Sequence, residues 1–185
     1  PSNELFSAPI YSAAKISPNG KYLSITEKLE QKTALTFVDL ETYETYVAAV
    51  FNVNEKIKSH IWLNDKQLYL EVKTHKKTIE FIYDFEFKKP KDSSSLSRIL
   101  SGKLVNRLPN DKEHVLISKK GRNIAGKHQL HKIAIEDLKQ NNHDNTELID
   151  KTNKSILLYL YDDNFQRIIT TELSKDGEKI LLKWR

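Results

Sequence analysis

The chain has 185 residues, of which 38% are hydrophobic and 9% aromatic, so it is long enough for a folded core and is not a disordered chain. Its 30 basic and 25 acidic residues give a net charge of +5 that is spread along the sequence, which favours a solvated surface over a nucleic-acid footprint. The absence of cysteine excludes disulfides, thiolate catalysis and cysteine-bound metals, and no apolar run is long enough to span a bilayer. We therefore expect no nucleic-acid partner and no membrane partner.

The sequence begins at Pro1 and contains no methionine. We expect that residues upstream were removed, and a signal peptide is one candidate for them. Both the cytoplasm and the periplasm stay open as compartments.

The first predicted element is a hairpin. Lys15–Ser17 and Tyr22–Ile25 alternate apolar and polar residues on either side of Ser17-Pro18-Asn19-Gly20. Pro18 fixes φ for the first central position of a type I turn, and Gly20 can adopt the positive φ that closes a bulged hairpin.

Period-two patterns continue along the rest of the chain. They predict strands in QLYLEVKT, TIEFIYDFEF, EHVLIS, SILLYLY and KILLKW. The stretch from Ile135 to Asn142 is the only helical candidate, and we interpret it as a turn. The chain is therefore expected to be all-β.

Turns similar to this first one recur twice later in the sequence. Asn19, Asn64 and Asn110 each precede a glycine or aspartate, a lysine and a strand, at spacings of 45 and 46 residues. A repeat of about 40 to 50 residues built from short strands is typical of β-propeller blades. We predict a partial β-propeller of about three to four blades of short antiparallel strands, with blades at approximately 10–50, 55–90, 100–150 and 155–185. The polar excursion from Lys88 to Gly102 is interpreted as a loop between blades.

The ordered motifs resemble the N-terminal propeller of prolyl-oligopeptidase-family serine peptidases, especially the acylaminoacyl-peptidase-like branch. The motifs are Ser17-Pro18-Asn19-Gly20-Lys21, Val38-Asp39-Leu40, Trp62-Leu63-Asn64-Asp65, the LPNDKEHVLI stretch with Asp111 and His114, and the last hairpin with Asp162 and Arg167. Three positions depart from the family pattern: Asn19 replaces aspartate, and Tyr43 and Phe165 stand where glycine is common.

The resemblance implies a function for a larger parent protein. In this family an α/β-hydrolase domain carries the catalytic serine, and the propeller limits access to short peptides and helps to hold them. No pair of the five glycines brackets a serine as Gly-x-Ser-x-Gly. We expect no catalytic, cofactor or metal residue in residues 1–185 and no activity of this fragment alone, whereas the resemblance implies that the parent is a serine peptidase. Its implied partners are the missing catalytic domain, the remaining blades and a peptide substrate.

Other candidate residues favour structural roles. His128 and His131 lie three apart on opposite faces of a strand, which disfavours a metal pair, and His60 and His75 are interpreted as ordinary strand residues. Asp162 and Asp163 fit the capping of a turn, with Arg167 as their ion-pair partner. Trp62 and Trp184 fit packing between blades. The basic turn Lys119–Arg122 is too short for a phosphate-binding loop.

The rival interpretation is a non-enzymatic interaction module of the Tol-system propeller type, which shares the SPNGK-like turn. A standalone lectin-like β domain is the third, less favoured alternative. On either propeller interpretation, blades at the ends of a partial propeller leave strand edges unpaired, so self-association is expected.

Overall fold

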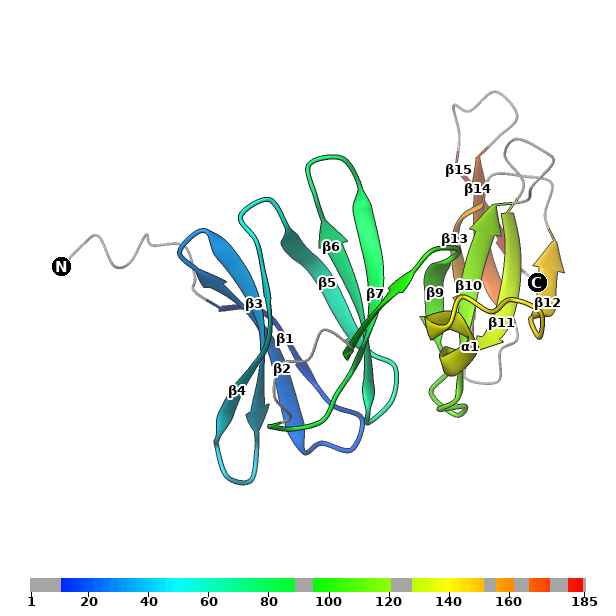
Figure 1. The fold of residues 1–185 in the computed structure, drawn as a ribbon. Helices are drawn as coiled ribbons and strands as arrows, with labels where there is room; N and C mark the ends of the chain where they lie inside the picture. Colours follow the sequence, from blue (N-terminus) through cyan, green and yellow to red (C-terminus); the bar gives the residue numbers. More distant parts are fainter. Residues whose placement is uncertain are drawn as a thin grey trace. The chain divides into compact units, whose positions relative to one another are not determined.

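The computed structural model describes residues 11–88, 95–120, 128–151, 156–161, 167–173 and 180–184. The chain divides into two compact units, Pro1–Arg98 and Ile99–Arg185. Each unit is built from antiparallel sheets whose strands follow one another in chain order (Figure 1).

The first unit contains two four-stranded sheets. The first sheet has the order β1 (Tyr11–Ile16), β2 (Tyr22–Leu29), β3 (Lys32–Asp39) and β4 (Thr45–Phe51). The second has the order β5 (Lys56–Trp62), β6 (Gln67–Lys73), β7 (Thr78–Asp84) and β8 (Leu96–Ile99), so its last strand ends one residue beyond the unit boundary.

The second unit contains a four-stranded and a three-stranded sheet. The larger sheet is formed by β9 (Lys103–Arg107), β10 (His114–Lys120), β11 (His128–Ala134) and β12 (Glu147–Lys151), with helix α1 (Ile135–Lys139) in the connection between β11 and β12. The smaller sheet is formed by β13 (Ile156–Tyr161), β14 (Arg167–Leu173) and β15 (Ile180–Trp184).

The all-β prediction is confirmed, but the sequence patterns missed the last strand of each four-stranded sheet. In β4, Val47, Ala48, Ala49 and Val50 form an apolar run without alternation, and a bulge shifts its pairing with β3 between Leu35 and Thr36. β8 has only four residues and lies within the stretch from Lys88 to Gly102 that we interpreted as loop, so that interpretation is wrong for Leu96–Ile99.

The stretch from Ile135 to Asn142 is also not a simple turn, because Ile135–Lys139 forms helix α1. Ile135 and Leu138, three residues apart, are both buried on one side of the helix. Glu136 and Asp137 lie in its first turn, where their negative charges interact favourably with the helix dipole. Lys139 closes the helix with an ion pair to Glu136 at 3.0 Å. The helix has too few residues for periodicity to reveal it in the sequence.

The core of the first unit lies between its two sheets and is rich in aromatic rings. Phe37 contacts Trp62, Tyr83 and Phe85 with ring centroids 5.5, 5.7 and 4.4 Å apart. Phe37 is fully buried and Trp62 is 2% exposed. Rings of this size contribute several kcal/mol each by burial, so this cluster joins the sheets.

Strand β6 is an inner strand of the second sheet and is buried on both faces. Leu68, Leu70 and Val72 face the aromatic core as the alternation predicts, but Tyr69 and Glu71 on the opposite face are also no more than 8% exposed. The alternation of apolar residues in β6 therefore predicted the core-facing side of the strand correctly, but it did not predict that the opposite side is buried as well.

Gly102 sits in a position that accepts only glycine. Its φ is +94°, and a Cβ atom there would lie 2.8 Å from Cδ1 of Ile117, which is fully buried on β10. We expect Gly102→Ala to lower the free energy of unfolding by about 2 to 3 kcal/mol, because it combines backbone strain with overpacking. Urea unfolding followed by circular dichroism measures the loss. The paired variant Gly102→Ala/Ile117→Val should recover part of it, and an unchanged unfolding midpoint in Gly102→Ala would contradict the clash.

Tyr43 occupies the position where glycine is common in related turns. Its φ is +59° and its side chain is 77% exposed, so it bears backbone strain with little packing in return. We expect Tyr43→Gly to raise the free energy of unfolding by about 0.5 to 1 kcal/mol. The thermal midpoint would rise accordingly, whereas Tyr43→Ala, which keeps a Cβ atom, should not raise it by the same amount.

Candidate functional site

The opening turn is held by its own side chains. The Ser17 hydroxyl donates to Asn19 Oδ1 at 2.7 Å and accepts the backbone N–H of Tyr22 at 3.0 Å. The backbone N–H of Gly20 donates to the Ser17 carbonyl at 2.9 Å, and Gly20 has a φ of +73°. Ser17 is 3% exposed and engaged in the turn, so its hydroxyl serves the backbone.

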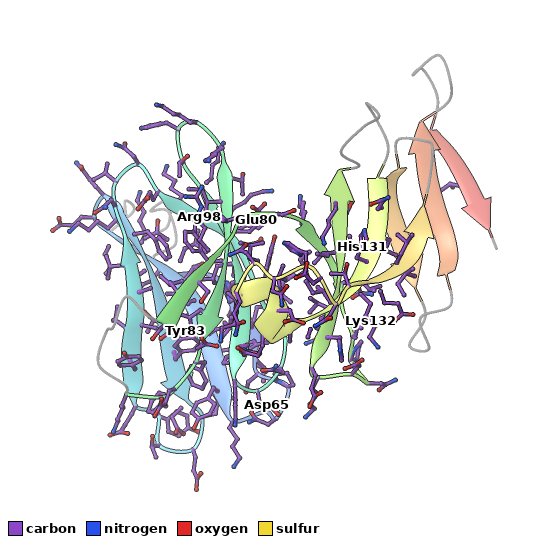
Figure 2. The ribbon with its side chains drawn as sticks, turned by 45° about the vertical axis from the view of Figure 1, so that its right-hand side comes forward. Asp65, Glu80, Tyr83, Arg98, His131 and Lys132 are labelled. Carbon is purple, nitrogen blue, oxygen red and sulfur yellow. The ribbon has the colours of Figure 1, made fainter. Side chains whose placement is uncertain are left out.

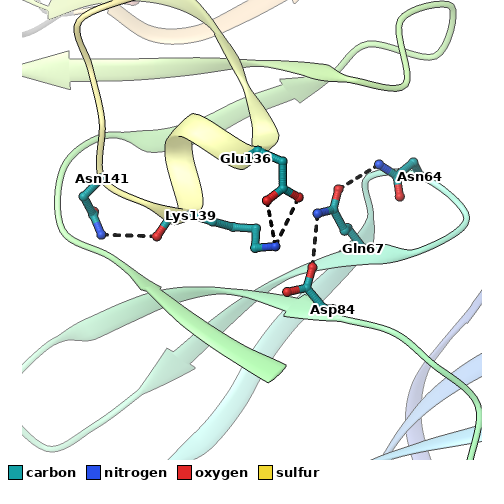
Figure 3. A network of polar contacts seen from close by, with 6 residues as sticks. All are labelled: Asn64, Gln67, Asp84, Glu136, Lys139 and Asn141. Atoms are coloured by element: carbon teal, nitrogen blue, oxygen red, sulfur yellow. Dashed lines mark hydrogen bonds and ion pairs between the residues drawn. The ribbon is translucent and has the colours of Figure 1, made fainter. Parts of the chain in front are cut away.

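The second turn, between β5 and β6, repeats this chemistry with different partners. Asn64 Oδ1 accepts the backbone N–H of Lys66 at 2.9 Å, and its amide donates to Gln67 Oε1 at 2.9 Å. Gln67 in turn donates to Asp84 Oδ1 at 3.1 Å, which ties the turn to β7 (Figure 3). Asp65 is half-buried in the same turn, and Figure 2 labels it.

The third turn, between β9 and β10, uses an aspartate as its centre. Asp111 forms an ion pair with Lys132 Nζ at 2.7 Å, its Oδ1 lies 2.9 Å from His114 Nδ1, and Oδ1 also accepts the N–H of Glu113. Burial raises the pKa of Asp111, but the hydrogen bonds from Lys132 and His114 outweigh it and lower the pKa to about 2. Asp111 thereby ties the turn to β11.

A polar contact joins the two sheets of the first unit beside the aromatic core. His60 on β5 lies 2.9 Å from the Ser24 hydroxyl on β2, measured from Nε2 to Oγ. Ser24 donates to the carbonyl of Lys15 on β1 at 3.1 Å, and Trp62 Nε1 donates to the same carbonyl at 3.2 Å. We call Lys15, Ser24, His60 and Trp62 the inter-sheet clamp.

The hydrogen bonds of the clamp define the state of the imidazole. Because the Ser24 proton goes to Lys15, the His60 Nε2 atom must donate to Ser24, which leaves Nδ1 as an unprotonated atom. Nδ1 is buried and has no hydrogen-bond partner among the residues that the structure describes. Burial lowers the pKa of His60 to about 4, with the charge of Lys15 acting in the same direction and the contact with Ser24 opposing it.

A serine and a histidine at this distance resemble the nucleophile and base of a hydrolase, but the clamp cannot act as one. Ser24 is fully buried and His60 is 1% exposed, so no substrate can reach either group. The prediction assigned His60 an ordinary strand role and did not pair it with Ser24. No sequence signal links residues 36 positions apart on separate strands.

The remaining candidates are placed as follows. Trp62 is buried between the sheets, and His75 is exposed with its ring 2.6 Å from Asn54 Oδ1. Arg167 begins β14 opposite Tyr161, whereas Asp162 lies outside the described residues. His128 and His131 pair with Lys120 and Ile117 and stand on opposite faces of β11.

Two kinds of site are not found in the described part of the chain. No group of three histidine, cysteine, aspartate or glutamate residues there has a geometry suited to a metal ion. No helix within those same ranges has the length and apolar character needed to cross a membrane.

Comparison with known proteins identifies the fold. No family model and no curated protein matches the sequence. The β-propeller domain of the Trilobed protease from Pyrococcus furiosus aligns with 94% of this chain at a TM-score of 0.54 and 17% identity. The acylaminoacyl peptidase of Pyrococcus horikoshii aligns with 93% of it at a TM-score of 0.52 and 14% identity.

The chain spans 54% of the length of the first structure and 29% of the second. The four sheets formed by the described residues and these alignments confirm the all-β prediction and its propeller character. The residue ranges given for the blades stay a prediction. The resemblance that the motifs indicated is confirmed at the level of the fold, and the chain is built like the β-propeller domains of acylaminoacyl and prolyl-oligopeptidase-family peptidases.

Proposed function

We propose that the chain is the non-catalytic propeller portion of a serine peptidase and that it gates the access of peptides to an α/β-hydrolase domain of the parent protein. The observation that carries this proposal is the alignment of nearly the whole chain with two peptidase propellers. The ordered motifs from Ser17 to Arg167 support it independently. The one buried serine–histidine pair of the described residues is inaccessible, which agrees with chemistry carried elsewhere.

The parent protein provides the test of the enzyme part of the proposal. A fluorophosphonate probe should label the parent on a serine of a Gly-x-Ser-x-Gly elbow, and the chain of residues 1–185 alone should stay unlabelled. A parent that carries only further propeller repeats and reacts with no probe would instead support the non-enzymatic interaction module.

The gating part is tested with the inter-sheet core. In the parent, Trp62→Ala should loosen the propeller and raise kcat/KM for long peptides, while kcat/KM for a dipeptide substrate stays within about twofold. Trp62→Phe, which retains most of the packing, is the matched control. Equal loss of activity on long and short peptides would argue against a gate and for general destabilisation.

The remaining blades and a second copy of the chain are the partners that we propose for the first sheet. On its face away from the core, Ile16 is 62% and Val50 42% exposed, and Leu23, paired with Ile16 and Val38, is half-buried. Apolar surface of this kind gains stability when covered. Light scattering at low micromolar concentration should show self-association of residues 1–185, and a compact monomer would count against it.

A further inference from the structure

Three connections lie together at one end of the first unit (Figure 1). They are the turn between β2 and β3, the loop between β4 and β5, and the turn between β6 and β7, with residues 28–32, 52–56 and 73–77. Val53 lines one groove with the turn between β2 and β3, and His75 Nε2 lies 2.6 Å from Asn54 Oδ1. The middle loop therefore touches both of its neighbours. We call these three ranges the lysine end.

The lysine end gathers positive charges that are far apart in the sequence. It has two glutamates, Glu30 and Glu55, and six exposed lysines, which are Lys28, Lys32, Lys56, Lys73, Lys76 and Lys77. None of the six lysines forms an ion pair with a described residue. The turns at the opposite end of the same unit, residues 17–21, 39–44, 63–66 and 84–88, contain six acidic residues and three lysines. The fold therefore separates charges that look evenly spread along the sequence.

The strand register adds an unfavourable contact to this end. Lys56 on β5 is paired directly with Lys73 on β6. Like charges that face each other across antiparallel strands destabilise the pair. Glu55 is engaged with its own loop, since its Oε2 accepts the backbone N–H of Asn52 at 3.4 Å. Two glutamates cannot balance six lysines, so an anionic partner would relieve the repulsion that remains.

An open groove of about 500 Å³ lies within the lysine end and has an apolar part. Leu29 and Val53, which are 40% and 48% exposed, supply that part, and the rest of the lining comes from Lys28, Glu30, Gln31 and Lys32. A hollow accepts an inserted side chain, whereas docking on a lipid surface requires apolar side chains that protrude. The three ranges contain no Phe, Tyr or Trp on which the bases of a nucleic acid could stack.

We propose that the lysine end is a docking surface for an acidic segment of a partner protein, in which carboxylates flank an apolar side chain. The apolar side chain enters the groove between Leu29 and Val53, and the carboxylates face the surrounding lysines. Complementary charge of this kind speeds association and selects the partner. The proposal concerns a surface of the first unit and does not depend on the peptidase function.

The experiment measures the fluorescence anisotropy of a labelled peptide of glutamates around a central leucine, titrated with the whole chain. We expect saturable binding that weakens as the salt concentration rises from about 50 to 300 mM, because the lysines are exposed. The variant Lys73→Gln/Lys76→Gln/Lys77→Gln should weaken binding about tenfold. Salt-independent binding, or an unchanged affinity of this variant, would contradict the proposal.

The opposite end of the unit provides a matched control. Lys21→Gln/Lys66→Gln/Lys88→Gln also removes three exposed lysines, so it changes the net charge equally, and it should leave the affinity within about twofold. If both triple variants weaken binding equally, net charge alone attracts the peptide and the proposed surface is wrong.

The groove has a separate test. Val53→Ser should weaken binding of the leucine peptide but not of the same peptide with serine in place of leucine. Glu30→Gln removes a negative charge from the lining and should strengthen binding about twofold, so the test does not rest on loss of function alone. If Val53→Ser affects both peptides equally and Glu30→Gln gains nothing, no side chain enters the groove.

Other occupants are distinguished in parallel. Vesicles containing phosphatidylserine and a single-stranded DNA oligonucleotide replace the peptide in the same titration. Binding of either one without binding of the peptide would overturn the proposal and assign the lysine end to a membrane or a nucleic acid. A second copy of the chain, docking through its acidic end, is indicated if the chain self-associates through Lys73, Lys76 and Lys77 and does not bind the peptide, and that result would also overturn the proposal.

Discussion

Acid should destabilise the first unit through His60. The pKa of this group is lowered from an ordinary value of 6.5 to about 4, so the unfolded chain binds more protons than the folded chain between these values. Its contribution to stability is complete above about pH 6.5 and is lost as the pH falls towards 4. At pH 5.0 the loss attributable to His60 should be about 2 kcal/mol.

The measurement uses urea unfolding at pH 7.5 and 5.0 followed by tryptophan fluorescence. The chain has two tryptophans, so a Trp184→Phe background leaves Trp62 in the inter-sheet clamp as the reporter. His60→Gln keeps an N–H donor for Ser24 but does not titrate, and it should remove most of the pH dependence. His75→Gln, at an exposed histidine, is the matched control and should keep the pH dependence of the stability.

The two pH values also separate His60 from the acidic groups. The pKa of Asp111 is lowered to about 2, so its contribution to stability is present above about pH 4 and is lost only as the pH falls further. His131 and His143, whose pKa values are also lowered, are unchanged between the compared variants. An identical loss of stability in His60→Gln and in the unmodified chain would show that His60 is not the acid-sensitive group.

Truncation of Trp62 should have the largest effect of any single change in the first unit. Its side chain is 2% exposed, contacts the rings of Phe37 and Phe85, and donates to the Lys15 carbonyl. We expect Trp62→Ala to lower the free energy of unfolding by about 3 to 5 kcal/mol, because a large cavity forms between the sheets. Far-UV circular dichroism in urea measures the change.

A graded series distinguishes packing from the hydrogen bond. Trp62→Phe retains much of the ring packing but loses the donor, so its expected cost is about 1 to 2 kcal/mol. Leu182→Ala, at a side chain that is 73% exposed, should change stability by less than about 0.5 kcal/mol. If Trp62→Phe costs as much as Trp62→Ala, the hydrogen bond to Lys15 dominates over packing.

The sequence predicted those parts of the fold that depend on local patterns. Ser17-Pro18-Asn19-Gly20 forms the turn that its residues favour, and Leu68, Leu70 and Val72 face the core as their alternation indicated. The spacing of the repeated turns predicted the propeller, because each turn begins a similar hairpin. Strands β4, β8 and β12 and helix α1 were missed, since they are short or lack a clear period and depend on pairing with neighbours.

The third turn contains a carboxylate contact that matching of the asparagines did not predict. Asn19 and Asn64 each accept the N–H two residues further on, and in the third repeat Asp111 accepts the N–H of Glu113 in the same way. A carboxylate at that place also attracts Lys132 and His114, which an amide would do less strongly. Asp111 therefore links the third turn to β11 through Lys132.

By itself, the sequence determined the all-β class, the repeated hairpins, the resemblance to peptidase propellers and the lack of a Gly-x-Ser-x-Gly elbow, because each is written in neighbouring residues or in their spacing. Only the tertiary structure decided that Ser24 meets His60 and that Trp62 joins two sheets. These contacts join residues on different strands, and their energies depend on burial and register, which no local pattern encodes.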